Sequence, residues 1–489
     1  MKVNERDSTP AKGGSDDDRR VMTTFHYPQE LRRTIRFFGS FAVAFSFISI
    51  TTGISVNFEL VLSGAGPAGF WTWPIVTIGQ FLVALVFAEL AARMPLTGYS
   101  YQWVTRLAGH GWGWFTGWLA VCFLIIVVPS VDHAIAGVVG HMLGIKDSPL
   151  TLKLIVCGVM LAQAAIHIFG VRLANGINSA AVFTEVVGMV GLVAIFAVLA
   201  AVNRPSLEIL FNTGNAETQG PYWQAFVMAS LMGAYTLVGF ESAANLSEET
   251  HNAGNIVPRA VILSVLLSGG VGTLFLIFVV LGIEDLEAVT KAAYPLPVII
   301  ESNLGTLAAN LFFALIIVSV FACGLIIMAS GSRLIYAMSR DDVFLGSKVF
   351  SQVSKRTAVP TNAILLILAL GIIAELFAES LEQLLLAAAV LPALIYLLTV
   401  TSYATRRNRM RTTFGTFSLG RWGTLVSVLA IGWLILVIGV LTIPKKFHSA
   451  TIVSVILCVV GAVIYFSWIR SKIQRGEAGI QIDDKGQDS

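Results

Sequence analysis

Three carboxyl side chains stand inside long apolar runs of the sequence: Asp132, Glu185 and Glu241. An ionised carboxylate in the middle of a membrane costs at least about 2.5 kcal/mol to insert, so such residues are usually paired or functional. Their own runs contain no Lys or Arg, so a partner must come from another helix, a solute or a proton. A low dielectric disfavours the ionised form, so a carboxyl group that changes its exposure could couple proton movement to conformation. Glu185 and Glu241 are our candidates for that proton-coupling role.

Each of these carboxyl groups also has a structural alternative. Glu241 could be a protonated hydrogen-bond hub that ties its helix to the neighbouring helices. Asp132 lies towards the far end of its run and could reach the outer water interface. Glu185 lies nearer the middle of its run and is harder to place in water.

Two of the apolar runs contain poor helix centres. One reads Ser49-Ile50-Thr51-Thr52-Gly53, and the other reads Tyr235-Thr236-Leu237-Val238-Gly239. β-Branched, hydroxyl-bearing and glycine residues weaken a helix interior. An interruption frees backbone groups that lipid cannot satisfy, so it must line a protein cavity. Alternatively, the two glycines are packing residues in continuous helices, since glycine is common in membrane helices.

The freed backbone groups would suit a zwitterionic solute. N–H groups at Thr51, Thr52 and Gly53, at the positive end of a half-helix, could hold a carboxylate. Carbonyl groups near Tyr235 and Val238 could hold an ammonium group, with Asp132 or Glu241 as its counter-charge. The predicted substrate-binding residues are Ser49, Thr51, Thr52, Gly53, Asp132, Tyr235, Val238, Gly239 and Glu241.

The sequence lacks the motifs of other kinds of functional site. The sequence has no phosphate-binding loop, zinc motif or nucleophile elbow. The four cysteines stand inside apolar runs without metal-ligand spacing, so we interpret them as small buried residues. We interpret His133 and His167 as packing residues. The basic residues form no nucleic-acid patch. We therefore expect no enzyme, no cofactor, no metal site and no nucleic-acid partner.

The elements that must position these residues are membrane helices. Of the 489 residues 56% are hydrophobic and 12% are charged, against about 25% charged in a soluble domain. A helix needs about 20 apolar residues to cross the hydrocarbon core of a lipid bilayer. We predict an all-α integral membrane protein with twelve transmembrane helices, near residues 37–62, 70–91, 113–141, 151–169, 176–202, 222–246, 258–282, 303–330, 361–378, 382–403, 422–443 and 449–469.

The Lys and Arg residues predict the orientation of these helices. Of the 32 basic residues, six lie in the odd-numbered connections, and the other 26 lie in the even-numbered connections and the two terminal stretches. Cytosolic segments are enriched in Lys and Arg. We therefore expect both termini in the cytosol.

Three groups of motifs carry a resemblance to a known family. The first is Ala88–Leu90 with Pro95 and Gly98–Tyr101, the second is Gly239–Ser242 with Ser247–Thr250 and Asn255–Ala260, and the third is Ser332–Asp341. Along most of its length the chain resembles the amino acid–polyamine–organocation superfamily. It looks most like the amino acid/choline transporter branch, which includes GABA permeases, through Phe45–Ile54, Ser130–Asp132 and Glu185.

The resemblance implies a LeuT-like fold. This fold has two inverted five-helix repeats followed by two further helices, and its helices one and six are broken. We accordingly divide the chain into a disordered cytosolic tail (1–36), a transport core (37–403) with halves at about 37–202 and 222–403, a basic cytosolic loop (404–421), helices 11 and 12 (422–469) and a cytosolic tail (470–489).

The resemblance also implies a function. The expected protein is a plasma-membrane permease for an amino acid or related amine such as GABA, coupled to protons and working by alternating access. The alternatives are a choline or polyamine transporter and a transport-inactive substrate sensor, and the oligomeric state stays open.

Two positions depart from the family pattern. Many relatives carry Gly-Ser-Gly where this chain has Thr51, Thr52 and Gly53. Some relatives carry a Lys where we align Glu185, so a Lys-based coupling scheme is not available here. Glu185 could bind a proton or ligate sodium, and desolvation favours the proton.

Overall fold

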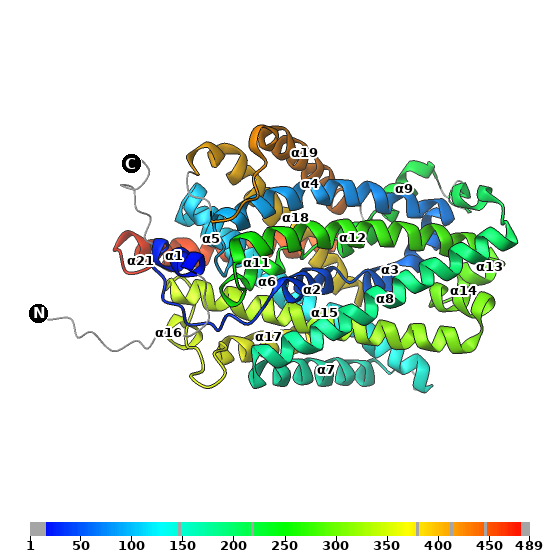
Figure 1. The fold of residues 1–489 in the computed structure, drawn as a ribbon, viewed down its shortest axis with the longest axis horizontal. Helices are drawn as coiled ribbons and strands as arrows, with labels where there is room; N and C mark the ends of the chain where they lie inside the picture. Colours follow the sequence, from blue (N-terminus) through cyan, green and yellow to red (C-terminus); the bar gives the residue numbers. More distant parts are fainter. Residues whose placement is uncertain are drawn as a thin grey trace, which may run out of the picture.

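The computed structural model describes residues 16–144, 148–214, 216, 220–377, 381–410, 414–444 and 447–480. Within these ranges the chain is helical and forms no β-strand; a single parallel bridge pairs Ile35 with Thr250. The long helices run along one axis of an elongated bundle (Figure 1).

Nine helical spans in the described ranges are long and apolar enough to cross a membrane. Two of them join shorter elements: α2 (Phe37–Ile48) continues into α3 (Ile50–Ala65), and α20 (His448–Ile464) continues into α21 (Arg470–Gln474). The other seven contain α4 (Thr72–Arg93), α6 (His110–Leu143), α7 (Pro149–Phe169), α8 (Val171–Asn203), α12 (Ala253–Leu281), α15 (Thr306–Arg340) and α19 (Gly423–Thr442).

The three remaining predicted spans have other forms. Residues 222–246 are divided among α9 (Tyr222–Ala229), α10 (Leu231–Thr236) and α11 (Ser242–Asn245). The ninth predicted span is α17 (Thr361–Phe377), a shorter apolar helix of 17 residues, and its last predicted residue lies outside the described ranges. The tenth corresponds to α18 (Leu381–Arg406).

The interruption of the first span lies at Ser49, between α2 and α3. Ser49 has a left-handed backbone with φ of 39°. The prediction of a break at Thr51–Gly53 was wrong by two residues, because these residues form the first turn of α3. Serine is a favoured N-cap, and the Ser49 side chain accepts a hydrogen bond from the Thr52 N–H at 3.4 Å.

The interruption of the sixth span lies where it was predicted, at Leu237–Gly239. The helix α10 ends at Thr236, and α11 begins at Ser242. Gly239 has φ of +84°, and a Cβ atom at this position would lie 1.8 Å from the Phe47 ring. Only glycine fits both the left-handed backbone and this close approach of the two interrupted spans.

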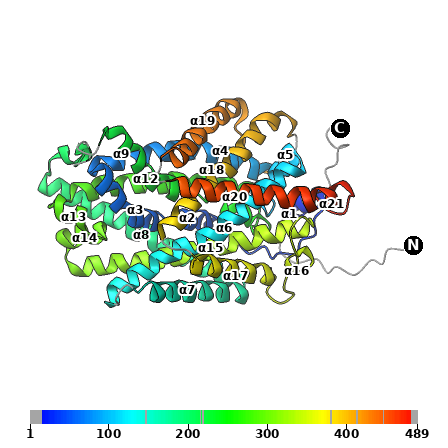
Figure 2. The same cartoon turned by 180° about the vertical axis from the view of Figure 1, so that it is seen from behind.

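The ends of the bundle are capped by short helices. One end carries α1 (Asp16–Thr24), α5 (Tyr99–Ala108), α16 (Ser347–Phe350) and α21, as both views show (Figures 1 and 2). The opposite end carries α13 (Leu286–Lys291) and α14 (Pro295–Leu304). The first and last described helices therefore lie at the same end.

The prediction of a disordered tail over 1–36 was wrong for residues 16–36, which we call the N-terminal strap. The strap contains α1 and buries Val21, Met22 and Leu31. Asp18 on α1 accepts hydrogen bonds from the backbone N–H groups of Asn252 and Ala253 at the start of α12, so its carboxylate stabilises a helix N-terminus. Residues 1–15 lie outside the described ranges.

The C-terminal stretch also packs against the bundle as far as it is described. The Gly479 N–H donates to the Asp341 carbonyl at 2.8 Å, and the Ile480 carbonyl lies 2.9 Å from a His110 ring nitrogen. Residues 476–480 also line one hollow together with residues 25–28, so this stretch lies beside the strap. Residues 481–489 lie outside the described ranges.

Candidate functional site

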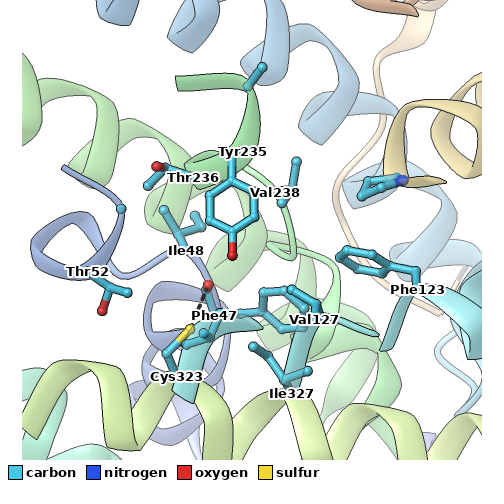
Figure 3. A pocket seen from close by; sticks show the side chains of 14 residues that line it. Phe47, Ile48, Thr52, Phe123, Val127, Tyr235, Thr236, Val238, Cys323 and Ile327 are labelled. Atoms are coloured by element: carbon cyan, nitrogen blue, oxygen red, sulfur yellow. Dashed lines mark hydrogen bonds between the residues drawn. The ribbon is translucent and has the colours of Figure 1, made fainter. Parts of the chain in front are cut away.

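A small cavity of about 20 Å³ lies where the two interrupted spans meet. It is lined from spans one and six by Phe47, Ile48, Thr52, Gly53, Ala234, Tyr235, Thr236 and Val238, and from α6, α15 and α18 by Phe123, Val127, Val131, Cys323, Ile327 and Pro392. Tyr235 lies in the middle of the view, with Thr52 on one side and Phe123 on the other (Figure 3). None of these lining side chains is a carboxylate, a Lys or an Arg.

The polar groups at the cavity wall are few and come from different helices. The Tyr235 hydroxyl lies 3.1 Å from the Ser130 hydroxyl on α6. The Cys323 thiol donates to the Phe47 carbonyl at 3.3 Å, which joins α15 to the end of α2 (Figure 3). An ammonium group in such a wall would be held by hydroxyl and backbone carbonyl oxygens rather than by a carboxylate.

Spans one and six touch directly beside the cavity. A Cβ atom on Gly53 would lie 2.0 Å from the Thr236 hydroxyl oxygen, so glycine is needed for this approach. The Thr236 hydroxyl itself donates to the Met232 carbonyl at 2.6 Å. The first turn of α3 is therefore held against the last turn of α10.

Glu185 on α8 also contacts the start of α3. This side chain is 1% exposed. Its Oε1 accepts hydrogen bonds from the Thr51 N–H at 3.0 Å and from the Ser49 hydroxyl at 3.1 Å. A carboxylate at a helix N-terminus satisfies free N–H groups and interacts favourably with the helix dipole.

A row of hydroxyl groups links the cavity to Glu185. Thr52 lines the cavity, and its hydroxyl lies 2.6 Å from the Ser49 hydroxyl. The Ser49 hydroxyl in turn contacts the Glu185 carboxylate. Hydroxyl groups both donate and accept, so this row can pass a proton between the cavity and the buried carboxyl group.

Glu241 faces another part of the molecule. Its Oε2 accepts a hydrogen bond of 2.6 Å from the Tyr396 hydroxyl on α18. The same hydroxyl accepts from the Gly239 N–H at 2.9 Å. Glu241 thus supports the turn of the sixth span and does not line the cavity, which matches the hub alternative.

Asp132 also lies away from the cavity wall. Its Oδ1 accepts a hydrogen bond of 2.8 Å from the Gln163 amide on α7, and Asp132 is fully buried. The neighbouring residue Val131 faces the cavity instead. We expect Asp132 or Glu241 beside a solute amine; in the structure both side chains bind other helices and neither lines the cavity.

The other predicted residues divide between the two sides of the α3 start. Thr52, Gly53, Tyr235 and Val238 line the cavity. Ser49 and Thr51 face Glu185, and Gly239 shapes the turn. The structure thus brings four predicted residues into one cavity wall.

Most residues of the apolar cavity wall could not be predicted from the sequence. Phe47, Phe123, Val127, Cys323 and Ile327 stand in continuous apolar runs, where nothing distinguishes a cavity residue from a lipid-facing one. In the described part of the chain no three His, Cys, Asp or Glu side chains converge as metal ligands do.

Comparisons with known proteins bear on the identity of this site. A family model described as amino acid permease matches residues 35–465. The amino-acid permease BAT1 of Arabidopsis thaliana is 26% identical over 458 residues, covering 86% of this chain and 87% of the relative.

Two fungal relatives carry narrower names. The GABA-specific permease of Saccharomyces cerevisiae is 25% identical over 500 residues, covering 96% of this chain and 87% of the relative. A putative polyamine transporter of Candida albicans is 25% identical over 379 residues, covering 72% of this chain and 67% of the relative. The family model spans both interrupted helices and their cavity, and the chain is a multi-pass membrane transporter and not an enzyme. It belongs to the amino acid permease family of the amino acid–polyamine–organocation superfamily.

Proposed function

We propose that the chain carries an amino acid or related amine such as GABA across the plasma membrane, coupled to protons and by alternating access. The observation that carries this proposal is the cavity between the two interrupted spans, joined by hydroxyl groups to the buried Glu185. Interrupted membrane helices in matching positions of two repeats are typical of secondary transporters.

The proposed topology has twelve crossings, with two inverted five-helix repeats followed by two helices. The interruptions at Ser49 and Gly239 support it, because they fall in the first helix of each proposed half. An even number of crossings also agrees with α1 and α21 at one end (Figures 1 and 2). By the distribution of Lys and Arg we place that end in the cytosol.

In the proposed binding mode the solute amine contacts the carbonyl groups near Tyr235 and Val238 and the Tyr235 hydroxyl. A solute carboxylate would face the first turn of α3 at Thr52 and Gly53. A cavity of about 20 Å³ holds about one water molecule. Binding therefore requires another conformation in which the cavity is larger, as alternating access provides.

The proposed coupling site is Glu185. A buried carboxyl group without a basic partner is stable when protonated, and the Ser49 and Thr52 hydroxyl groups connect it to the cavity. Glu241 keeps a supporting role, because its bond to Tyr396 fixes the turn that carries Gly239.

A choline or polyamine substrate is the second candidate. Phe47, Phe123 and Tyr235 line the cavity, and aromatic faces attract organic cations. The relative named a polyamine transporter agrees with this reading.

The test is uptake by purified protein in proteoliposomes. The panel contains amino acids, GABA, choline and polyamines, each with and without an imposed pH gradient. Accumulation of amino acids or GABA that follows the pH gradient supports the proposal, and accumulation confined to choline or polyamines supports the second candidate. Accumulation that needs sodium and ignores the pH gradient contradicts proton coupling, and no uptake of any solute contradicts both candidates.

A further inference from the structure

The start of α3 already holds a carboxylate, and it belongs to the chain itself. Glu185 accepts hydrogen bonds from the Thr51 N–H and the Ser49 hydroxyl. The N–H groups of the next two residues are also engaged, that of Thr52 by the Ser49 hydroxyl and that of Gly53 by the Ser49 carbonyl. The first turn of this 16-residue helix is thus occupied by internal partners.

Two further buried hydroxyl groups stand beside the same carboxylate. They belong to Thr51 on α3 and Ser319 on α15. Both residues are at most 1% exposed, and among the described residues neither hydroxyl is bound to a group other than Glu185. A carboxylate accepts about four hydrogen bonds, so these two hydroxyl groups, the Thr51 N–H and the Ser49 hydroxyl form an anion pocket that the Glu185 carboxylate itself fills.

The cavity and Glu185 both contact the first turn of α3. Thr52 and Gly53 face the cavity, whereas Ser49 and Thr51 face Glu185. Two ionised carboxylates within one turn repel each other, and each favours protonation of the other. A solute carboxylate and an ionised Glu185 therefore compete for the same helix N-terminus.

We propose that Glu185 is an internal anion at the carboxylate site of α3 and that it must take up a proton before a solute carboxylate can bind there. The inference rests on the proposed function. It assigns proton-linked binding to amines that carry a carboxylate, whereas amines without a carboxylate bind without proton uptake. Substrate chemistry, and not the transporter alone, then decides whether a proton is bound.

The surroundings of Glu185 leave this carboxyl group as the proton acceptor of the site. The neutral hydroxyl groups of Ser49, Thr51 and Ser319 face it from α3 and α15. Among the described residues, the Cys323 thiol on α15 is a titratable group that interacts with Glu185, and it also interacts with Asp132. A thiol is neutral at physiological pH, so it neither replaces Glu185 as an anion nor supplies a counter-charge.

The test compares matched solutes that differ in one carboxyl group. Ornithine and putrescine form one pair, and GABA and propylamine form the other. Affinities are measured with the purified full-length protein at several pH values. For ornithine and GABA the affinity should rise as the pH falls, by up to about tenfold per pH unit for one linked proton. For putrescine and propylamine it should change by less than about twofold per pH unit.

The Glu185→Gln variant separates this inference from other causes of pH dependence. It should bind the carboxylate-bearing solutes with an affinity that no longer depends on pH. Glu375→Gln is the matched control, because Glu375 is another buried carboxyl group, bonded to His133 at 3.1 Å on a different helix pair. This control should keep the pH dependence of the unmutated protein.

Three results would overturn the inference while leaving the transporter assignment intact. They are pH-independent binding of ornithine and GABA, equal pH dependence in both members of a pair, and a pH dependence that survives Glu185→Gln. If Glu185→Gln does not fold, Glu185→Asp replaces it. Its shorter side chain should weaken the hold on the Thr51 N–H and raise the affinity for the carboxylate-bearing solutes at neutral pH, and an unchanged affinity would count against the inference. Failure of every solute to bind would contradict the proposed function itself.

Discussion

At the scale of single residues, the predicted site residues divide into those that line the cavity and those that bind other helices. Tyr235 points into the cavity, while Asp132 and Glu241 bind Gln163 and Tyr396 on neighbouring helices. All three residues stood out in the sequence. Their directions could not be predicted, because adjacent positions such as Val131 and Asp132 face different neighbours on the same helix.

The Tyr235→Phe variant tests the contact of the phenol with the solute. It removes the hydroxyl group that lies 3.1 Å from Ser130 but keeps the ring. One hydrogen bond contributes about 1 kcal/mol, so the substrate affinity should fall roughly three- to tenfold. The measurement is substrate affinity from competition binding. Ser130→Ala is the control, since it removes the partner and keeps the phenol; an equal loss in both variants would mean that the Tyr235 hydroxyl acts only through Ser130.

The buried carboxyl groups of spans three and six should matter little for affinity. Asp132→Asn and Glu241→Gln remove charge and keep the shape and an acceptor oxygen. Because neither side chain lines the cavity, substrate affinity should change by less than about threefold in each variant. Equilibrium binding measures this directly. A loss of a hundredfold in either variant would mean that the carboxylate turns towards the amine when the solute binds.

At the scale of elements, the two interruptions had unequal signals in the sequence. The turn at Gly239 follows from a glycine among β-branched residues, and the structure adds the ring of Phe47 as the reason for it. The break at Ser49 was placed two residues late, because an N-cap serine and a helix-interior serine look alike without the contact to Glu185. The N-terminal strap was missed for a related reason. Asp18 stands among other aspartates in a polar stretch, and its role as a cap of α12 depends on a helix more than 200 residues away.

Gly239→Ala should destabilise the turn of the sixth span. The alanine would adopt a left-handed backbone and place its Cβ atom against the Phe47 ring. Strain and overpacking each cost about 1–3 kcal/mol, so a loss of about 2–6 kcal/mol is expected. Thermal unfolding of the detergent-solubilised protein reports it. Gly270→Ala is the matched control, because a Cβ atom there meets no atom within 4 Å, and a melting temperature lowered equally in both would contradict the account.

The N-terminal strap should be released by Tyr27→Ala. The Arg340 guanidinium stacks 3.7 Å from the centre of the Tyr27 ring, and the Tyr27 hydroxyl donates to Asp341 at 2.8 Å. We expect faster proteolysis within residues 16–36 of the variant, measured on the purified protein. Lys291→Ala at the opposite end is the control, since its exposed ion pair with Glu287 contributes little. Unchanged cleavage in Tyr27→Ala would show that the other contacts of the strap are enough to hold it against the bundle.

The Tyr27 contact also predicts how the strap responds to alkali. Burial raises the pKa of Tyr27 from 10.0 to about 12. A group whose pKa is raised in the folded state stabilises that state fully below its ordinary pKa and loses the effect as the pH rises through the raised value. The strap contact should therefore hold up to about pH 10 and weaken between about pH 10 and 12. Proteolysis that accelerates in Tyr27→Phe over the same range as in the unmutated protein would assign the alkaline effect to another group.

At the scale of the whole molecule, the apolar runs predicted most of the long helices, and the glycine, hydroxyl-bearing and β-branched residues within two runs predicted the interrupted ones. The sequence could not predict that the cavity and Glu185 contact the same helical turn, because this depends on the direction in which each residue of that turn faces. We therefore propose that protons that reach Glu185 through the Ser49 and Thr52 hydroxyl groups drive the uptake of an amine-bearing solute.

Solute accumulation in proteoliposomes with an acidic exterior tests this claim most directly. The unmutated protein should accumulate its amino acid or GABA substrate above the external concentration, and accumulation should stop when the pH gradient is dissipated. Glu185→Gln should still exchange internal for external substrate but should no longer accumulate it. Undiminished gradient-driven accumulation by Glu185→Gln would remove Glu185 from the coupling mechanism and contradict the account.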